Sequence, residues 1–306
     1  MSAGVTVRVP AKVNVQLAVG GARPDGYHDL ANVFLAVGLY DEVTVTPADS
    51  LTISCTGADA DQVPLDRGNL AARAAELLAA RHGIEPNVHI HIAKDIPVAG
   101  GMAGGSADGA GALLACDTLW GLESPQSALL DICAELGSDV PFSLVGGAAL
   151  GTGRGERLTV LPVGGDFHWV FAVAYGGLST PAVYREFDRL NADVAVPAPV
   201  ASSQLLEALR TGDTSALAGS LVNDLQPAAL SLRPSLADTL AAGTAAGALA
   251  ALVSGSGPTT AFLAKDADAA AGIAEALLAS GSCRTARATG APARGATVIQ
   301  YSGAVS

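Results

Sequence analysis

Hydrophobic and polar residues alternate along the first stretch of the chain, and this alternation predicts its first element. Over Val5–Val19 every odd position is apolar, whereas the even positions include Lys12, Asn14 and Gln16. A period of two is typical of a strand with one buried face, so these three polar side chains share the opposite face. Pro10 lacks a backbone N–H, which indicates an edge strand or a bulge.

The rest of the first half divides into short strands and helices bounded by glycine, proline and capping residues. We predict a hairpin from two strands, Glu42–Thr46 and Leu51–Cys55. Further strands are predicted at Asn87–Lys94 and within Ala148–Leu161. Helices are predicted at Asn69–His82 ending at Gly83, at about Gly105–Trp120, and from Ser124-Pro125 to Leu136.

The second half has a different order of elements, in which helices separate the strands. Predicted strands are Trp169–Tyr175, Leu249–Ser254, Thr259–Ala264 and Ala296–Tyr301. Predicted helices are Ser179–Leu190, Gln204–Arg210, Thr214–Asn223, Ser235–Ala246 and Asp266–Ser280. This order fits a split βαβ sheet with helices on one face. We therefore predict an α+β fold with two domains, residues 1–164 and 165–306, that meet near Gly164-Gly165.

Composition and charge narrow the class of protein. Of the 306 residues, 50% are hydrophobic, which is ample for packed cores and excludes a disordered chain. The 17 basic and 29 acidic side chains give a formal net charge of −12, which argues against binding to nucleic acids or to anionic membranes. A local site can still oppose the global charge and bind one anionic ligand.

The cysteines and the N-terminal stretch indicate a compartment. No pair of cysteines has CxxC spacing, so we expect buried thiols in a reducing environment at Cys55, Cys116, Cys133 and Cys283. Residues 1–16 lack the apolar core of a signal peptide, and Thr239–Val253 is too short and too rich in glycine for a membrane span. We expect a cytoplasmic protein, as a monomer or weak dimer.

A glycine-rich loop between a predicted strand and a predicted helix is the first candidate for chemistry. Within Pro97–Asp108, backbone amides can approach a ligand closely at Gly100, Gly101, Gly104 and Gly105. The helix that follows offers N–H groups to an anion, Ser106 adds a hydroxyl, and Lys94 adds a charge. The loop matches neither a Walker A motif nor GxGxxG. A phosphate site and a tight turn with close helix packing both fit it.

Two further candidates are charged side chains far apart in the sequence. Lys12 and Asn14 share the polar face of the first strand, which is either a solvated surface or part of a site. Asp139 follows a helix stop in the segment Gly137–Phe142, where it is either part of a capping turn or a partly buried carboxylate. A buried carboxylate needs a cation or hydrogen-bond donors, and Lys12 could supply the charge.

Three motifs occur together in one order: Pro10–Asn14 (PAKVN), Pro97–Ala107 (PVAGGMAGGSA) and Ser254–Thr259 (SGSGPT). As an ordered set they resemble the GHMP kinases, the family of galactose, homoserine, mevalonate and phosphomevalonate kinases. The loop departs from the commoner family pattern at Met102-Ala103, in place of Leu-Gly, and at Ala107-Asp108, in place of Ser-Asn. The resemblance implies a ribosomal-S5-like N-terminal α/β domain, a ferredoxin-like C-terminal split-βαβ domain, and an active site in the cleft between them.

The resemblance also implies transfer of a phosphoryl group from ATP to an alcohol. Asp139 would take the proton of the acceptor hydroxyl as general base, and Lys12 would stabilise the developing alkoxide. Lys94 and Asn69 would lie near the nucleotide. Mg²⁺, with no protein ligand assigned, would offset the charge of the ATP phosphates, which the loop would cradle with Pro97, Val98, Ala99, Gly100, Gly101, Met102, Ala103, Gly104, Gly105 and Ser106.

Three segments, Pro10–Leu17, Arg23–Leu30 and Gly137–Phe142, are similar to the family members that phosphorylate a cytidine diphosphate-linked methylerythritol in the non-mevalonate route to isoprenoids. This similarity places seven residues at the acceptor: Asn14, Tyr27, His28, Tyr184, Gly255, Ser256 and Gly257. Asn14 would orient the acceptor hydroxyl, Tyr27 would stack on the cytosine, and His28 would bind its edge. Tyr184 either stacks on the other face or belongs to a helix core.

Alternatives to this acceptor stay open in the sequence. A kinase of the same family could act on another small alcohol such as homoserine or mevalonate, and the segment Arg23–Leu30 discriminates because ATP binding requires it least. A nucleotide-binding module without catalysis is a further alternative, although the chain retains both Lys12 and Asp139. A Rossmann oxidoreductase fits less well, since strict GxGxxG is missing.

Overall fold

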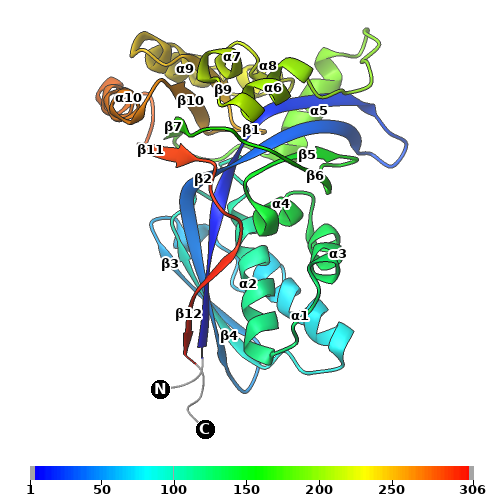
Figure 1. The fold of residues 1–306 in the computed structure, drawn as a ribbon. Coiled ribbons are helices and arrows are strands. Elements are labelled where there is room, and N and C mark those ends of the chain that lie inside the picture. Colours follow the sequence, from blue (N-terminus) through cyan, green and yellow to red (C-terminus); the bar gives the residue numbers. More distant parts are fainter. Residues whose placement is uncertain (1–3, 99, 303–306) are drawn as a thin grey trace.

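The computed structural model describes residues 4–98 and 100–302, which form two β-sheets and their covering helices (Figure 1). Within these residues the first sheet has eight strands: β1 (Gly4–Ala22), β2 (His28–Pro47), β3 (Thr52–Gly57), β4 (Val88–Lys94), β5 (Ala148–Thr152), β6 (Arg157–Leu161), β8 (Val222–Asn223) and β12 (Thr297–Ser302). Its main path runs β12-β1-β2-β4-β3; β5 pairs with β2 and β6, and β8 pairs with β1.

The second sheet confirms the predicted split βαβ arrangement. Its strands lie in the order β11-β7-β10-β9, with the bounds β7 (Phe167–Val173), β9 (Ala250–Val253), β10 (Thr260–Ala264) and β11 (Thr285–Ala291). Numbered along the chain within this sheet, the order is 4-1-3-2, and every pairing is antiparallel. The predicted α+β fold class is therefore confirmed.

Helices cover one side of the first sheet, and the helices of the second half of the chain lie beside the second sheet (Figure 1). Those on the first sheet are α1 (Leu70–His82), α2 (Gly104–Trp120), α3 (Gln126–Leu136) and α4 (Val140–Val145), and a short 3-10 helix, η1 (Ala60–Gln62), follows β3. The others are α5 (Thr180–Leu190), α6 (Ser203–Thr211), α7 (Thr214–Ala218), α8 (Gln226–Leu232), α9 (Ser235–Ala245) and α10 (Ala267–Ser280). None of the helices in the described ranges is both long and apolar enough to cross a membrane.

Strand β1 is buried on both faces, which explains how its polar residues can serve a site. The apolar odd positions are in the core, as predicted, but Lys12, Asn14 and Gln16 are also no more than 5% exposed. Gln16 donates a hydrogen bond from its side-chain amide to the carbonyl oxygen of Val200 at 2.7 Å, so the second half of the chain covers this face. At Pro10 the register with β2 shifts, which confirms the bulge, and the pairing with β12 has already ended at Arg8, so the missing N–H of Pro10 costs no strand pairing on that side.

Two expectations for the strands are wrong and one strand is not predicted, because a local pattern shows at most the faces of a segment and not its partner. β3 does not form a hairpin with β2, because β4 inserts between them and pairs with β3 in parallel. The predicted final strand is β12, which joins the first sheet beside β1 and not the second sheet. The fourth strand of the second sheet is β11, an alanine-rich stretch without a clear apolar alternation.

The far ends of β1 and β2 reach the second half of the chain, where Figure 1 shows them beside α5. Leu17 and Leu30 pack there in a buried cluster with Val183, Phe187 and Leu225. Apolar burial of this kind is the main favourable contribution to folding. The ends of both strands are thereby fixed against helices α5 and α8, and the space beside them becomes a possible site.

The cysteines agree with the expected buried thiols at three of four positions. Cys116, Cys133 and Cys283 are buried, whereas Cys55 is only half-buried, and all four are free thiols. Burial raises the pKa of the Cys133 thiol to about 12. The thiolate is the reactive form, so burial keeps this thiol unreactive.

Gly111 of α2 faces the first sheet and leaves no room for a side chain. A substitution at this position therefore tests how closely α2 packs on the sheet. A Cβ at this position would lie 2.8 Å from the Cγ2 atoms of both Val9 and Val43, which are fully buried. Gly111→Ala should lower the free energy of unfolding by about 1–3 kcal/mol in urea denaturation. Gly272→Ala in α10, where a Cβ meets nothing within 4 Å, should raise it by about 0.5–1 kcal/mol. Equal effects at the two positions would contradict this packing.

Candidate functional site

A cavity of about 640 Å³ lies where β1, β2, the glycine loop and α5 meet. The start of α4 and the turn between β9 and β10 complete its walls. The predicted site residues that line it are Lys12, Asn14, Tyr27, His28, Gly100, Gly101, Ala103, Gly104, Ser106, Asp139, Tyr184, Gly255 and Ser256. The fold therefore brings candidates from both halves of the chain to one place.

Lys12 is a buried cation whose acceptors come from different segments. Its side chain is 6% exposed, and Nζ donates to Oδ1 of Asn14 at 2.7 Å and to the carbonyl oxygen of Gly101 at 3.0 Å. Asn14 in turn donates from Nδ2 to Oδ1 of Asn32 at 2.7 Å. A buried ammonium group is tolerated only with such partners. The alternative of a solvated strand face is wrong for these residues.

Asp139 supplies a negative charge beside this ammonium group. Its Oδ2 lies 3.5 Å from Lys12 Nζ, and its side chain is 32% exposed on the cavity wall. The residue precedes α4, where its backbone carbonyl accepts a hydrogen bond from the Ser143 amide at 3.2 Å. Its carboxylate caps none of the helix amides. The carboxylate is thus open toward the cavity and can accept a proton from a bound hydroxyl group.

The glycine loop is fixed by contacts to β1 and to the turn before β10. The Lys12 amide donates to the carbonyl oxygen of Met102 at 3.3 Å, and Ser254 Oγ donates to that of Gly101 at 3.2 Å. Gly101 has a φ of +75°, and a Cβ there would lie 2.1 Å from the Ser254 carbonyl oxygen, so the position requires glycine. Beyond the loop, α2 begins at Gly104 with no side chain of the described residues capping its first N–H groups. Helix amides in this state form an anion site.

Other predicted nucleotide residues lie away from the cavity wall. Asn69 caps α1, because its Oδ1 accepts from the Ala71 amide at 2.9 Å and its Nδ2 donates to the Pro64 carbonyl oxygen at 2.7 Å. Its nucleotide contact stays a prediction. Ala99 lies outside the described residues. The further candidates that do not line this cavity are Lys94, Pro97, Val98, Met102, Gly105 and Gly257.

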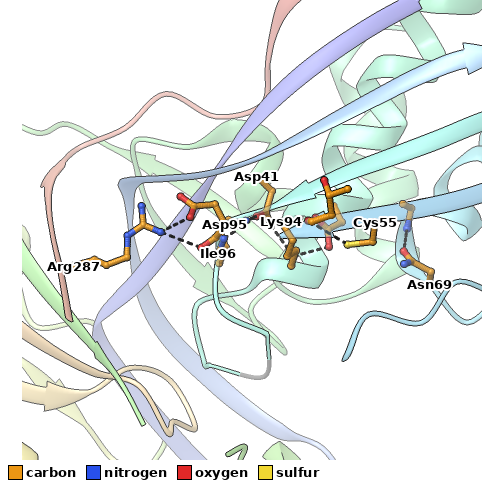
Figure 2. A network of polar contacts seen from close by, with 10 residues as sticks. Asp41, Cys55, Asn69, Lys94, Asp95, Ile96 and Arg287 are labelled. Carbon is orange, nitrogen blue, oxygen red and sulfur yellow. Dashed lines mark hydrogen bonds and ion pairs between the residues drawn. The ribbon is translucent and has the colours of Figure 1, made fainter. Parts of the chain in front are cut away.

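Lys94 lies in a buried cluster of charged side chains beneath the loop (Figure 2). Its Nζ lies 2.6 Å from Oδ2 of Asp41 and 2.6 Å from Oδ2 of Asp108. The second oxygen of Asp41 accepts the backbone amides of Asp95 and Ile96 at 2.7 and 2.8 Å. One lysine thus connects β4 with β2 and α2 directly below the start of the loop.

Two carboxylates share this one ammonium group, and they are not equivalent. Oδ1 of Asp108 has no hydrogen-bond partner among the described residues. Burial raises the pKa of Asp108 to about 7; the charge of Lys94 opposes this shift and that of Asp41 adds to it. Burial alone lowers the pKa of Lys94, but the two carboxylates outweigh burial, so its pKa is raised. Asp41 is the carboxylate with full hydrogen-bond support, and Asp108 is the excess one.

The outer end of the cavity is formed by aromatic and charged side chains. Tyr27 is 52% exposed, and the guanidinium group of Arg154 lies 5.1 Å from its ring centre. His28 is buried, with Nε2 2.8 Å from Oδ1 of Asp188 and its ring 5.0 Å from that of Tyr184. Asp188 therefore fixes the His28 ring and already occupies one of its nitrogens.

Tyr184 belongs to the cavity wall as well as to the packing of α5. Its ring contacts His28 and it packs against the apolar cluster at the ends of β1 and β2. Burial, with a contribution from the charge of Asp139, raises the pKa of Tyr184. Its hydroxyl group stays protonated and available as a donor. Tyr184 thus packs against a helix core, as one alternative predicts, and also faces the cavity, while its stacking on a base stays a prediction.

Sequence reasoning missed several charged and polar lining residues. Asn32 carried a signal, because it interrupts an apolar run in the β2 segment. Asp188 follows Tyr184 by one helical repeat and so shares its face of α5. Arg154 and Arg185 stand in a turn and on an exposed helix, and nothing in the local pattern distinguishes them from surface residues.

Comparison with protein families assigns both halves of the chain. Residues 69–147 match the GHMP kinases N terminal domain, and residues 205–283 match the GHMP kinases C terminal domain. The first match spans α1 to the turn after α4 and includes the glycine loop and Asp139. The second match spans most of the second sheet's helices and the turn with Gly255 and Ser256.

Relatives and solved structures are similar over nearly the whole chain. A 4-diphosphocytidyl-2-C-methyl-D-erythritol kinase from Streptomyces avermitilis is 79% identical over 295 residues, 96% of this chain and 99% of its own. One of the same name from Mycolicibacterium smegmatis is 55% identical, over 96% of this chain and 92% of its own. A crystal structure of 4-(cytidine 5'-diphospho)-2C-methyl-D-erythritol kinase has a TM-score of 0.77 at 34% identity, covering 94% and 99% of the two chains. A homoserine kinase from Cytophaga hutchinsonii shares the fold, with a TM-score of 0.74 at 22% identity and 97% coverage of both chains.

The excess carboxylate below the loop predicts a dependence of stability on pH. The pKa of Asp108 is about 7 in the folded chain, against an ordinary value of 3.8. Between pH 3.8 and pH 7, the folded state therefore binds a proton at Asp108 that the unfolded state does not bind. Its stability contribution is therefore full below pH 3.8 and is lost as the pH rises toward 7. Asp108→Asn should raise the free energy of unfolding by about 1–3 kcal/mol at pH 8 and change it little near pH 4.

Urea denaturation of both proteins across this pH range measures the effect. Asp41→Asn is the matched control, because it removes the carboxylate that accepts two backbone amides and should lower stability at every pH. If the free energy of unfolding of the wild type and of Asp108→Asn changed with pH in parallel, the raised pKa of Asp108 would be contradicted.

Proposed function

Because the chain belongs to the GHMP kinase family, we propose that it transfers the γ-phosphoryl group of ATP to the 2-hydroxyl group of 4-diphosphocytidyl-2-C-methyl-D-erythritol. The family makes the chain an ATP-dependent phosphotransferase. The names of the relatives at 79% and 55% identity support this acceptor and with it a step in the non-mevalonate route to isoprenoid precursors. Among the structural observations, the Lys12–Asp139 contact of 3.5 Å on the cavity that the glycine loop also lines carries the proposal.

The proposed reaction needs one proton acceptor and one cation at the alcohol. The acceptor oxygen forms a bond to the γ-phosphorus while the bond from that phosphorus to the β–γ bridging oxygen breaks, and ADP leaves with the electron pair. The proton of the hydroxyl group passes to the carboxylate of Asp139. Lys12 stabilises the negative charge on the acceptor oxygen, and Asn14 holds Lys12 at 2.7 Å. Positioning and charge stabilisation supply most of the catalysis in phosphoryl transfer.

The glycine loop and the start of α2 hold the ATP phosphates in this proposal. Their uncapped amides match a polyanion. In the described ranges no group of three His, Cys, Asp or Glu side chains could hold a metal ion, whereas Ser106 offers an oxygen atom on the cavity wall. Such a sparse oxygen set fits Mg²⁺, which keeps phosphate and water ligands. When bound, Mg²⁺ would offset the charge of the phosphates.

The outer end of the cavity suits a nucleoside diphosphate. Tyr27 presents an exposed ring for stacking on cytosine, with His28 and Tyr184 beside it. Arg154 and Arg185 line the same cavity and can pair with a diphosphate group. A chain with a net charge of −12 thus gathers cationic side chains at this cavity.

Removal of the general base tests the chemistry. Asp139→Asn keeps the size of the side chain but cannot take the proton, so kcat should fall by about 10²–10⁴-fold. A coupled ATPase assay with the cytidine-bearing acceptor measures the rate, and calorimetry of ATP binding is the control, which should change by no more than about twofold. Wild-type activity on homoserine or mevalonate equal to that on this acceptor would reject the proposed substrate.

A matched pair of arginines tests acceptor recognition. Arg154→Gln removes the cation beside Tyr27, so the KM for the acceptor should rise about tenfold while the KM for ATP stays unchanged. Arg8→Gln is the control, because Arg8 lies 5.5 Å from the ring centre of Tyr40, in similar geometry, but does not line the cavity. The same KM change in both variants would exclude a specific contact of Arg154 with the acceptor.

A further inference from the structure

Strand β11 of the second sheet contacts the segment that leads from β4 into the glycine loop. Arg284, directly before β11, and Arg287 within it each form an ion pair with a carboxylate of the first half. Figure 2 shows Arg287 directed toward Asp95, which in turn adjoins the buried cluster around Lys94. These contacts lie outside the reaction cavity, and nothing in the proposed reaction uses them.

Asp59 connects Arg284 to the far end of this segment. Both guanidinium nitrogens of Arg284 engage it, Nη1 with Oδ1 at 2.5 Å and Nη2 with Oδ2 at 2.6 Å, and the Asp59 side chain is 9% exposed. The hydrogen bonds from Arg284 are the main cause that lowers the pKa of Asp59, and the nearby Val98 backbone amide acts in the same direction. A bidentate pair with a carboxylate is geometrically specific. The carboxylate that Arg284 holds thus lies beside Val98.

Asp95 connects Arg287 to the near end of the segment. Nη1 of Arg287 lies 2.5 Å from Oδ1 of Asp95 and 3.3 Å from its backbone carbonyl oxygen. The amides of Asp95 and Ile96 are held at the same time by Asp41, whose other oxygen binds Lys94. This pair is more exposed than the first, at 37% for the arginine and 56% for the aspartate. Asp41 and Arg287 therefore hold the near end of the segment 95–98, and the carboxylate that Arg284 engages lies beside its far end.

The charges around the segment 95–98 affect how well the glycine loop can bind a triphosphate. Asp41, Asp59 and Asp95 place three carboxylates around the approach to the loop, and unpaired carboxylates there would repel the phosphates. Arg284 and Arg287 offset Asp59 and Asp95, and Lys94 offsets Asp41 while it also pairs with Asp108. The two arginines thus both fix the backbone before the loop and neutralise its surroundings.

We propose that Arg284 and Arg287 are positioning residues for ATP binding, which act through Asp59 and Asp95 on the segment 95–98 and so set how the glycine loop presents its amides. The second sheet then serves the phosphate loop as well as the acceptor cavity. This inference rests on the use of ATP by the loop and not on the identity of the acceptor. If the acceptor proves to be a different alcohol, the proposal for Arg284 and Arg287 can still be tested.

Binding of a non-hydrolysable ATP analogue to the full chain, measured by calorimetry, tests the proposal. Arg284→Gln should weaken the analogue about tenfold, and Arg287→Gln about twofold to threefold because its pair is more exposed. In steady-state kinetics the change should fall on the KM for ATP and not on the KM for the acceptor. Arg284→Lys retains the charge without the planar fork and should recover part of the affinity.

Arg210→Gln is the matched control. Arg210 forms an equally short bidentate pair with Glu207 on α6, at 2.5 and 2.8 Å, but it touches neither the loop nor the segment before it. The analogue should bind this variant as it binds the wild type. A double-mutant cycle of Arg287→Gln with Asp95→Asn should be non-additive, since each variant breaks the same contact.

Two results would overturn the proposal. One is a lower melting temperature for Arg284→Gln with analogue affinity within twofold of the wild type, which would leave the pair a purely structural contact. The other is a proportional loss of affinity for ATP and acceptor alike. If Arg284→Gln does not fold, the Arg287–Asp95 cycle decides alone, and additive effects on analogue affinity would then reject the role.

Discussion

The burial of one ammonium group constrains the whole site. Lys12 stands on a strand that is covered on both faces, and a charge removed from water needs acceptors close by. Asn14 of the same strand, the carbonyl oxygen of Gly101 and the carboxylate of Asp139 provide them. Because these groups come from separate segments, satisfying Lys12 brings the strand, the glycine loop and the start of α4 together. The fold and the chemistry thus depend on the same contacts.

A second buried lysine has a different task. Lys12 lies beside a carboxylate, Asp139, that is open to the cavity. Lys94, in contrast, is enclosed between Asp41 of β2 and Asp108 of α2. Asp108 shares Lys94 with Asp41, and its Oδ1 has no hydrogen-bond partner among the described residues, so the cluster carries one carboxylate more than it needs. One buried lysine, Lys12, is therefore available for a reaction, and the other, Lys94, stabilises the packing at the start of the glycine loop.

Local patterns predicted the elements well and their partners poorly. Alternation identified the faces of β1 and β4, and capping residues such as Gly83 identified helix ends, because these depend on neighbours in sequence. The pairing of β3 with β4 and of β12 with β1 depends on long-range packing that no local pattern encodes. At the site, motif residues such as Asp139 could be named in advance, whereas Arg154 reaches the cavity only through the fold of a turn.

The pairing of β12 with β1 has a consequence for how the chain acquires its structure. Gly4 lies opposite Ser302, so one side of the first residues of β1, Gly4–Arg8, stays without its strand partner until β12 has been synthesised. Contacts this distant in sequence slow folding, and an unpaired strand edge attracts other chains in the meantime. The strands of the second sheet all lie between Phe167 and Ala291, so none of its strand pairings requires β12. The first sheet, in contrast, cannot be complete before β12 has been synthesised.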